Sequence, residues 1–217
     1  MVSKTSTVVL DNGLRVLLEP MPTSQSASMG FFVKTGSRDE AESESGVSHF
    51  LEHMMFKGTR KRDSLQLTYD LGNIGAQSNA FTSEEVTVYY GTVVPEYVDD
   101  MVEILCDMLR STIPQSEFDV EKNVILEEIA LYQDRPTFCL YEEASEHFFS
   151  GQGSGNSVLG THASISALSR DQMKQYFDRR YLPSNMFFSI AGAFDPDAVL
   201  ARLQKDTADW VAGETSR

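Results

Sequence analysis

Hydrophobic and polar residues alternate in several short stretches of the chain, a pattern that predicts half-buried β-strands. The first two stretches, TSTVVL and RVLLEP, are joined across Asp11-Asn12-Gly13, whose residues tolerate the left-handed backbone of a tight turn. Residues 5–20 are therefore predicted to form a β-hairpin. The same alternation predicts a strand at 26–34, two strands within 75–92 that turn near Ser83, and a late strand at 186–192.

Other stretches repeat hydrophobic residues every three or four positions, as an α-helix with one buried face does. The longest of them begins at Pro114, a residue suited to the first turn, and is predicted to stop at Pro136. Gly58 follows another such stretch and predicts its C-terminal end. The predicted helices cover 49–57, 64–71, 97–109, 114–133, 138–149, 171–181 and 197–210, and the predicted loops cover 36–46 and 150–160.

Strands that come in hairpins and helices that come in groups predict the fold class. We expect an α+β fold, with a mainly antiparallel sheet and helices packed on one of its faces, and not a parallel βαβ array. The chain has 217 residues and is 41% hydrophobic, which is enough to bury one sizeable core. Because no internal repeat is visible, residues 1–217 are predicted to form a single domain.

Composition and charge exclude some classes of function. The formal net charge of −14 argues against a nucleic-acid surface, which needs clustered lysine and arginine. No hydrophobic run approaches the ~20 residues that cross a bilayer, so we expect no membrane insertion. The start of the chain does not resemble a signal peptide. Cys106 and Cys139 lie in hydrophobic surroundings and are expected to be reduced core thiols, which favours a cytoplasm-like compartment.

The stretch HFLEHMMFKGT, residues 49–59, carries the candidate chemistry. His49 and His53 are four residues apart and lie on one face of a helix, so both imidazoles can reach one metal ion. Glu52 borders the same face and is close enough to contact a water on that ion. A catalytic zinc site needs a third protein ligand, which these residues do not supply. The alternative is that the three polar residues simply form the solvated edge of a helix.

The long predicted helix offers carboxylates for the third ligand. Its stretch EKNVILEEI contains Glu121, Glu127 and Glu128. Glu121 and Glu128 are two turns apart and share a face, whereas Glu127 is rotated away by about 100°. One of the two could bind the metal while the other orients a histidine or the water. By themselves, two acidic residues at this spacing are more typical of a solvated helix face than of a metal site.

These residues also resemble those of a known family. The segment GSRDEAESESGVSHFLEHMMFKGT is similar to the signature of the inverted-motif zinc peptidases, the pitrilysin/insulinase family, in which H-x-x-E-H replaces H-E-x-x-H. FLEHMMFKGT, the ExxVILEE stretch and GAQSNAFTSEE most resemble the β-subunit of mitochondrial processing peptidase and its bacterial relatives. The resemblance extends from DNGLRVLLEP to MFFSIAGAFD, which is nearly the whole chain.

The resemblance implies a role for each candidate residue. It implies His49, His53 and Glu128 as the ligands of a Zn²⁺ ion, Glu121 as an accessory carboxylate and Glu52 as the general base. Family members also carry N-A-x-T on a strand beside the metal. That motif matches Asn79, Ala80, Phe81 and Thr82, whose backbone would pair with an extended peptide substrate.

The implied function is that of a zinc metalloendopeptidase that hydrolyses extended peptides or presequences, in the bacterial cytoplasm or a mitochondrial-matrix-like compartment. The family works as two similar halves that enclose the substrate, and this chain matches the first half. We therefore expect a partner, either a second homologous half or a subunit of a dimer, without which the isolated domain cleaves poorly. Two alternatives are a catalytically silent scaffold subunit and a zinc hydrolase that acts on a small molecule.

Overall fold

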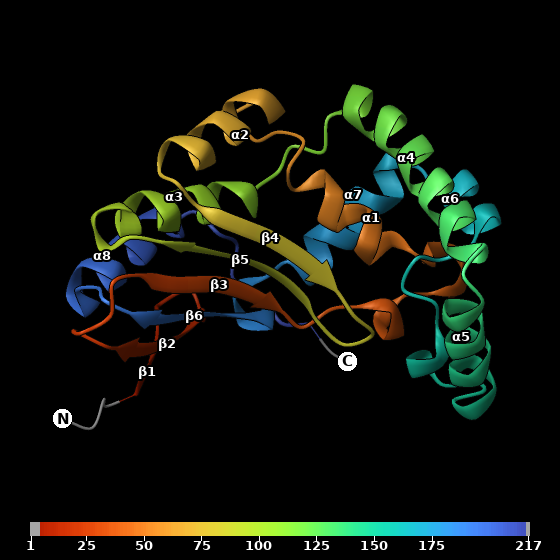
Figure 1. The fold of residues 1–217 in the computed structure, drawn as a ribbon, viewed down its shortest axis with the longest axis horizontal. Coiled ribbons are helices and arrows are strands. Elements are labelled where there is room, and N and C mark those ends of the chain that lie inside the picture. The colour runs from red at the N-terminus through yellow and green to blue at the C-terminus, as the bar shows by residue number, and fades with distance from the viewer. Residues whose placement is uncertain (1–4, 216–217) are drawn as a thin grey trace.

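The strands form one mixed sheet. The computed structural model describes residues 5–215, and within them six strands lie in the order β1-β2-β6-β3-β5-β4 (Figure 1). All neighbouring strands are antiparallel except β2 and β6, which are parallel. The α+β prediction is therefore confirmed. The strands are β1 (Ser6–Val9), β2 (Arg15–Pro20), β3 (Ala27–Val33), β4 (Gln77–Thr82), β5 (Thr87–Val93) and β6 (Met186–Gly192).

The helices follow the predicted pattern with three differences, of which the first is that the helix predicted at 49–57 ends at Met54 and not before Gly58. In the described part of the chain they are α1 (Val47–Met54), α2 (Ser64–Asn73), α3 (Val98–Met108), α4 (Gln115–Gln133), α5 (Pro136–Phe148), α6 (His162–Ala167), α7 (Arg170–Arg180) and α8 (Pro196–Asp206). Helix α6 was not predicted, because only Ile165 in it is buried and it has too few residues to show a hydrophobic period. Helix α8 ends four residues before the predicted limit at 210.

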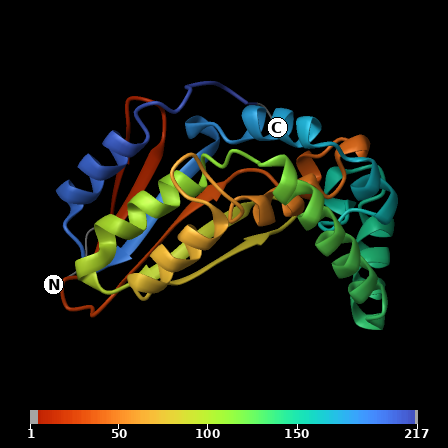
Figure 2. The same ribbon diagram turned by 90° about the horizontal axis from the view of Figure 1, so that it is seen from above.

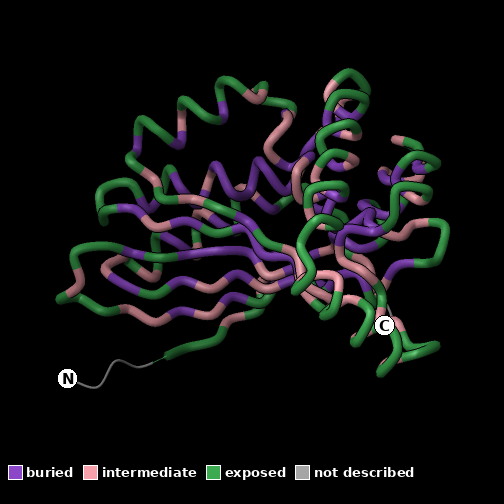
Figure 3. Tube along the Cα trace, turned by 45° about the vertical axis from the view of Figure 1, so that its right-hand side comes forward, coloured by how far each residue is buried: buried purple, intermediate pink, exposed green. Residues whose placement is uncertain are grey.

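Helices α2, α3 and α8 cover one face of the sheet, as predicted, and the other helices gather at one end of it (Figures 1 and 2). Along β3 the side chains of Met29, Phe31 and Val33 are buried, whereas Ser28 points to the other face and is exposed. This alternation is the pattern of a sheet with one covered face. Figure 3 shows the burial running along the strands and along the helices above them. The main core therefore lies between the sheet and the helical layer.

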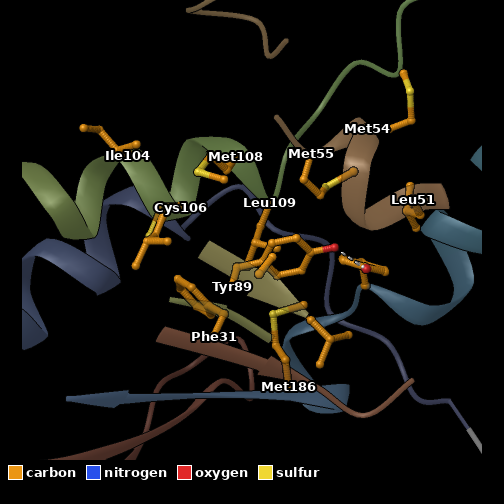
Figure 4. Close-up of a cluster of buried hydrophobic side chains, with 14 of the residues drawn as sticks. Phe31, Leu51, Met54, Met55, Tyr89, Ile104, Cys106, Met108, Leu109 and Met186 are labelled. Carbon is orange, nitrogen blue, oxygen red and sulfur yellow. Dashed lines mark hydrogen bonds between the residues drawn. The ribbon is translucent and has the colours of Figure 1, made fainter. Parts of the chain in front are cut away.

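The core also connects the sheet to α1. Phe31 and Tyr89 of the sheet lie beneath Cys106, Met108 and Leu109 of the α3 segment (Figure 4). Leu51, Met54 and Met55 extend the same cluster to the end of α1, and each is fully buried. Helix α1 thus lies at one end of the sheet, where it contacts β4, α4 and α7. The core holds α1 in a defined place relative to the edge strand β4.

The two cysteines differ in their surroundings. Cys106 is buried in the core, as expected, and both cysteines are free thiols. The prediction of a core thiol is wrong for Cys139, which is only partly buried. It lies in the first turn of α5, and its thiol donates to the carbonyl of Gln133 at 3.3 Å. Among the described residues no helix is long and hydrophobic enough to cross a membrane. The compartment stays a prediction, and residues 1–4 of the predicted non-signal start lie outside the described range.

Candidate metal centre

Helix α1 presents two histidines and a glutamate away from the core. It is only eight residues long, and Val47, Phe50, Leu51 and Met54 face the hydrophobic interior. The ring of Phe50 stacks on Phe118 of α4, with ring centroids 4.8 Å apart and planes 18° from parallel. Such an aromatic pair contributes ~0.5–1.5 kcal/mol beyond the area that it buries. This contact holds α4 against α1, and it thereby places the acidic face of α4 next to α1.

Two histidines and one carboxylate meet where the helices touch. Glu128 Oε2 lies 3.8 Å from His49 Nε2 and 3.7 Å from His53 Nε2. One ligand atom from each of the three residues lies within 4.8 Å of the others. These separations are too long for hydrogen bonds. They fit a shared ion, because two ligand atoms each ~2.0–2.1 Å from a tetrahedral zinc lie ~3.4 Å apart. The donor set of two imidazoles and one carboxylate also suits zinc.

Glu121 orients one of the histidines. Its Oε1 lies 2.8 Å from His53 Nδ1, and its Oε2 lies 2.6 Å from Lys57 Nζ. Burial acts to raise the pKa of Glu121, but the hydrogen bonds from His53 and Lys57 outweigh it and lower that pKa. An ionised Glu121 accepts a hydrogen bond from Nδ1–H and leaves Nε2 of His53 directed toward Glu128. The spacing had left open whether this carboxylate reaches a histidine or a water, and in the structure it contacts the histidine.

The two histidines have different protonation behaviour. Burial and the neighbouring charge of His53 lower the pKa of His49 to about 3, so its imidazole is neutral near pH 7. Burial also acts to lower the pKa of His53, but the hydrogen bond and charge of Glu121 raise it above its usual value. His49 is 9% exposed, and its Nδ1 has no hydrogen-bond partner in the part of the chain that the structure describes. A neutral, dry imidazole of this kind is a ready metal ligand.

Glu52 lies beside the candidate ligands and contacts the sheet. Its Oε2 accepts a hydrogen bond of 2.6 Å from the hydroxyl of Thr82, the last residue of β4. Burial raises the pKa of Glu52, although Thr82 and the charge of His53 act to lower it. Sequence reasoning did not predict this contact, because the two residues are 30 positions apart. The only feature of the sequence that pointed toward this contact was the threonine of the NAFT motif.

The remaining predicted residues lie on the edge strand and on the outer face of α4. Strand β4 ends the described sheet and is paired only with β5 there. Asn79 and Phe81 are exposed on it, while Ala80 points inward and is 9% exposed. Glu127 is exposed on α4, as its rotation relative to Glu128 predicted. The structure therefore brings together the candidate ligands, Glu52 and Glu121, with one end of an open strand next to them.

Known proteins share this chain's sequence and fold. A family model described as insulinase, peptidase family M16, matches residues 15–162, and a model of the M16 inactive domain matches 167–216. An uncharacterised zinc protease of Streptomyces coelicolor is 36% identical over 196 residues, which are 90% of this chain and 43% of that protein. The zinc protease YmxG of Bacillus subtilis is 36% identical over 200 residues, which are 92% and 48% of the two chains.

A solved structure has the same fold. The crystal structure of a protease from Helicobacter pylori superposes with a TM-score of 0.93 at 24% identity, over 100% of this chain and 53% of that one. The chain thus spans about half the length of the relatives that it matches. The family match covers most of the chain and includes His49, Glu52, His53 and Glu128. The predicted resemblance is confirmed, and the chain belongs to the insulinase family, peptidase family M16.

Proposed function

We propose that this chain is the zinc-binding domain of a metalloendopeptidase that hydrolyses extended peptides. The observation that carries the proposal is the cluster of His49, His53 and Glu128. Glu52 lies beside this cluster, at the end of the edge strand β4. His49 and His53 would hold the ion through Nε2, and Glu128 through a carboxylate oxygen. Zinc held there supplies Lewis acidity, which polarises a carbonyl oxygen and makes a water more acidic.

The chain's own residues supply the proton transfer. Glu52 accepts a proton from the attacking water and returns it to the leaving amine, which is the work of a general base and then of a general acid. Its burial supports this role, because a raised pKa brings the carboxyl nearer to the pH at which it must exchange protons. Glu121 holds the His53 imidazole in the tautomer that leaves Nε2 free for the ion.

Strand β4 is the proposed substrate-binding element. An edge strand has backbone N–H and C=O groups that a further strand can pair with, so an extended peptide can add to the sheet along Asn79, Ala80 and Phe81. Main-chain pairing of this kind suits a peptide and not a small molecule. The edge strand therefore favours a peptidase over the alternative of a small-molecule hydrolase.

We further propose that residues 1–217 act as one domain and require a second homologous half. The relatives are about twice as long, and the groups that hold the substrate from the other side are expected there. One observation favours the alternative of a silent scaffold subunit, namely the match of residues 167–216 to the inactive-domain model. The complete set of His49, Glu52, His53 and Glu128 favours the active role, because the fold alone does not require all four.

A cleavage assay separates these functions. The chain is incubated with a fluorogenic peptide and with an ester of a small acid, alone and with the second half of a relative such as YmxG. The proposal expects peptide cleavage that a chelator abolishes, that Zn²⁺ restores, and that increases at least about a hundredfold when the second half is present. Cleavage that does not depend on zinc would reject the peptidase in favour of another hydrolase. The chain together with the second half is called the assembled enzyme, and zinc binding without cleavage in that form would favour a scaffold.

Replacing Thr82 by valine tests the contact that holds Glu52. Valine keeps the shape but removes the hydroxyl, so kcat of the assembled enzyme is expected to fall about tenfold, which is ~1.4 kcal/mol. The zinc content should stay at the wild-type level, because the Thr82 hydroxyl forms its hydrogen bonds with Glu52 and Thr87. Thr82→Ser keeps the hydroxyl and should retain most of the activity. Equal losses in the valine and serine variants would show that the hydrogen bond is irrelevant.

Substrates with methylated backbone nitrogens test pairing with β4. In an antiparallel pair, alternate residues of the peptide direct N–H groups toward the neighbouring strand. Methylation at those positions is expected to raise KM about tenfold, because it removes a hydrogen bond and blocks the approach of the strand. Methylation of the residues between them provides the matched control and should leave KM nearly unchanged. A KM that responds equally at every position would argue against strand addition.

A further inference from the structure

The loop before α1 buries a carboxylate that the proposed mechanism does not use. Glu40 is 8% exposed, and its two oxygens accept hydrogen bonds from backbone N–H groups at the start of α1. Oε2 accepts from Gly46 and Oε1 from Ser48, each at 2.7 Å. Glu40 therefore binds the first turn of the helix that carries both histidines, from a position six residues before Gly46.

Helix α1 depends on this carboxylate for its N-terminal cap. The residue at its N-cap position is Gly46, which has a left-handed backbone (φ 87°) and no side chain with which to bind the free N–H groups. A Cβ atom on Gly46 would lie 2.6 Å from the carbonyl oxygen of Leu159, so no larger residue fits there. A carboxylate is the favoured partner at a helix N-terminus. Because so short a helix has little stability of its own, its contacts with the rest of the fold determine its position.

A buried polar network extends the same anchor to α7. The Ser48 hydroxyl lies 2.8 Å from the hydroxyl of Tyr176, which lies 2.7 Å from the hydroxyl of Thr35. Arg180 donates to Thr35 at 3.1 Å and is paired with Asp39, next to Glu40 in the chain, at 2.9 Å. The first turn of α1 is thus tied to the loop on one side and to α7 on the other.

His49 is the candidate ligand that depends most on this anchor. His53 is held in place by the hydrogen bond from its Nδ1 to Glu121. His49 follows Ser48 directly, and its Nδ1 has no partner among residues 5–215. Since no described residue orients the His49 ring by a hydrogen bond, the backbone of the first turn and the packing around the ring set where its Nε2 lies. Glu40 binds the backbone of this same turn, through the N–H groups of Gly46 and Ser48.

We infer that Glu40 is a positioning residue of the metal centre, which fixes the first turn of α1 and thereby places His49 opposite His53 and Glu128. The inference rests on the proposed zinc site. Burial raises the pKa of Glu40 to about 7 despite the hydrogen bonds from Ser48 and Gly46.

The zinc affinity of the 217-residue chain tests the inference. The dissociation constant is measured by competition with a chromogenic chelator for the wild type and for Glu40→Gln, which turns an amide N–H toward one of the two backbone donors. We expect Glu40→Gln to weaken zinc binding about tenfold, as is typical when support behind a ligand is removed. Tyr176→Phe, which removes one hydroxyl from the network and keeps Glu40, is expected to weaken it about threefold.

Asp195→Asn is the matched control. Asp195 caps α8 by accepting from the backbone N–H groups of Asp197 and Ala198, so this variant also loses a carboxylate cap, but far from the metal centre in the chain. Its zinc affinity should stay within twofold of the wild type, although thermal unfolding is expected to show a loss of stability in both cap variants.

The possible outcomes distinguish the role of Glu40 from the presence of the zinc site. An unchanged zinc affinity in Glu40→Gln, or an equal loss in Asp195→Asn, overturns the role of Glu40 while leaving the zinc site intact. A wild-type chain that does not bind one zinc ion overturns the proposed function itself. If Glu40→Gln does not fold, Glu40→Asp decides, because its shorter carboxylate cannot reach both backbone N–H groups, and a wild-type affinity in that variant rejects the inference.

Discussion

Replacing Glu52 by glutamine is expected to leave zinc bound and to lower kcat of the assembled enzyme by a factor of about 10²–10⁴. Glutamine has nearly the same size and can still accept the hydrogen bond from Thr82, so the site keeps its shape. An amide cannot accept and return the proton of the attacking water at neutral pH, which removes the step assigned to Glu52. Metal analysis of the purified variant and steady-state kinetics with a fluorogenic peptide measure the two effects.

Glu127→Gln is the control for Glu52→Gln. Glu127 is exposed on α4 next to Glu128, and the substitution makes the same chemical change outside the site. Its zinc content and kcat should both equal those of the wild type. Two results for Glu52→Gln would contradict the assignment: loss of zinc would make Glu52 a ligand or a structural residue, and retained activity would show that another group transfers the proton.

Removing any one of the three ligands is expected to abolish stoichiometric zinc binding. In His49→Ala, His53→Ala and Glu128→Ala, affinity should fall at least about a hundredfold, because the free energy of zinc binding is spread over few ligands. Inductively coupled plasma analysis after dialysis gives the zinc content. Circular dichroism is expected to show that the fold persists, because Phe50 and the rest of the buried face of α1 are unchanged. Full zinc content in any of the three variants would remove that residue from the ligand set.

Glu121→Gln separates an accessory carboxylate from a ligand. Glu121 contacts His53 and Lys57, so the variant should still bind zinc, with an affinity about 10–100-fold lower. Glu127→Gln again serves as the control on the same helix. A loss as large as that of Glu128→Ala would mean that Glu121 is itself a ligand and that the two carboxylates have exchanged roles.

Several features of the site were predictable because they depend on short-range spacing. Because His49 and His53 are four residues apart, they lie on the same face of their helix, and this does not depend on where the helix packs. The seven-residue separation of Glu121 and Glu128 does the same on α4, and it places Glu127 away from that face, where the structure has it exposed. The hairpin turn at Gly13, which has φ 90°, is equally local. In each case the backbone geometry of one element decides the result.

Other features depend on contacts between distant parts of the chain. The spacing did not tell which of Glu121 and Glu128 approaches which histidine, because that depends on how α4 packs on α1 through Phe50 and Phe118. The parallel pairing of β2 with β6 joins strands from opposite ends of the chain, and no local pattern indicates it. Cys139 has hydrophobic neighbours in sequence, yet α5 buries none of its residues, which is why the prediction of a core thiol was wrong.

The sequence by itself determined which residue types could form the metal centre, the helical faces that carry them and, through the family resemblance, the chemistry to expect. Local periodicity and spacing are sufficient for this, since they act within one element. Only the tertiary structure decided that Glu121 holds His53, that Thr82 holds Glu52 and that Glu40 caps the helix of the two histidines. The partners in these contacts lie on separate elements, and the packing of the common core determines which of them meet.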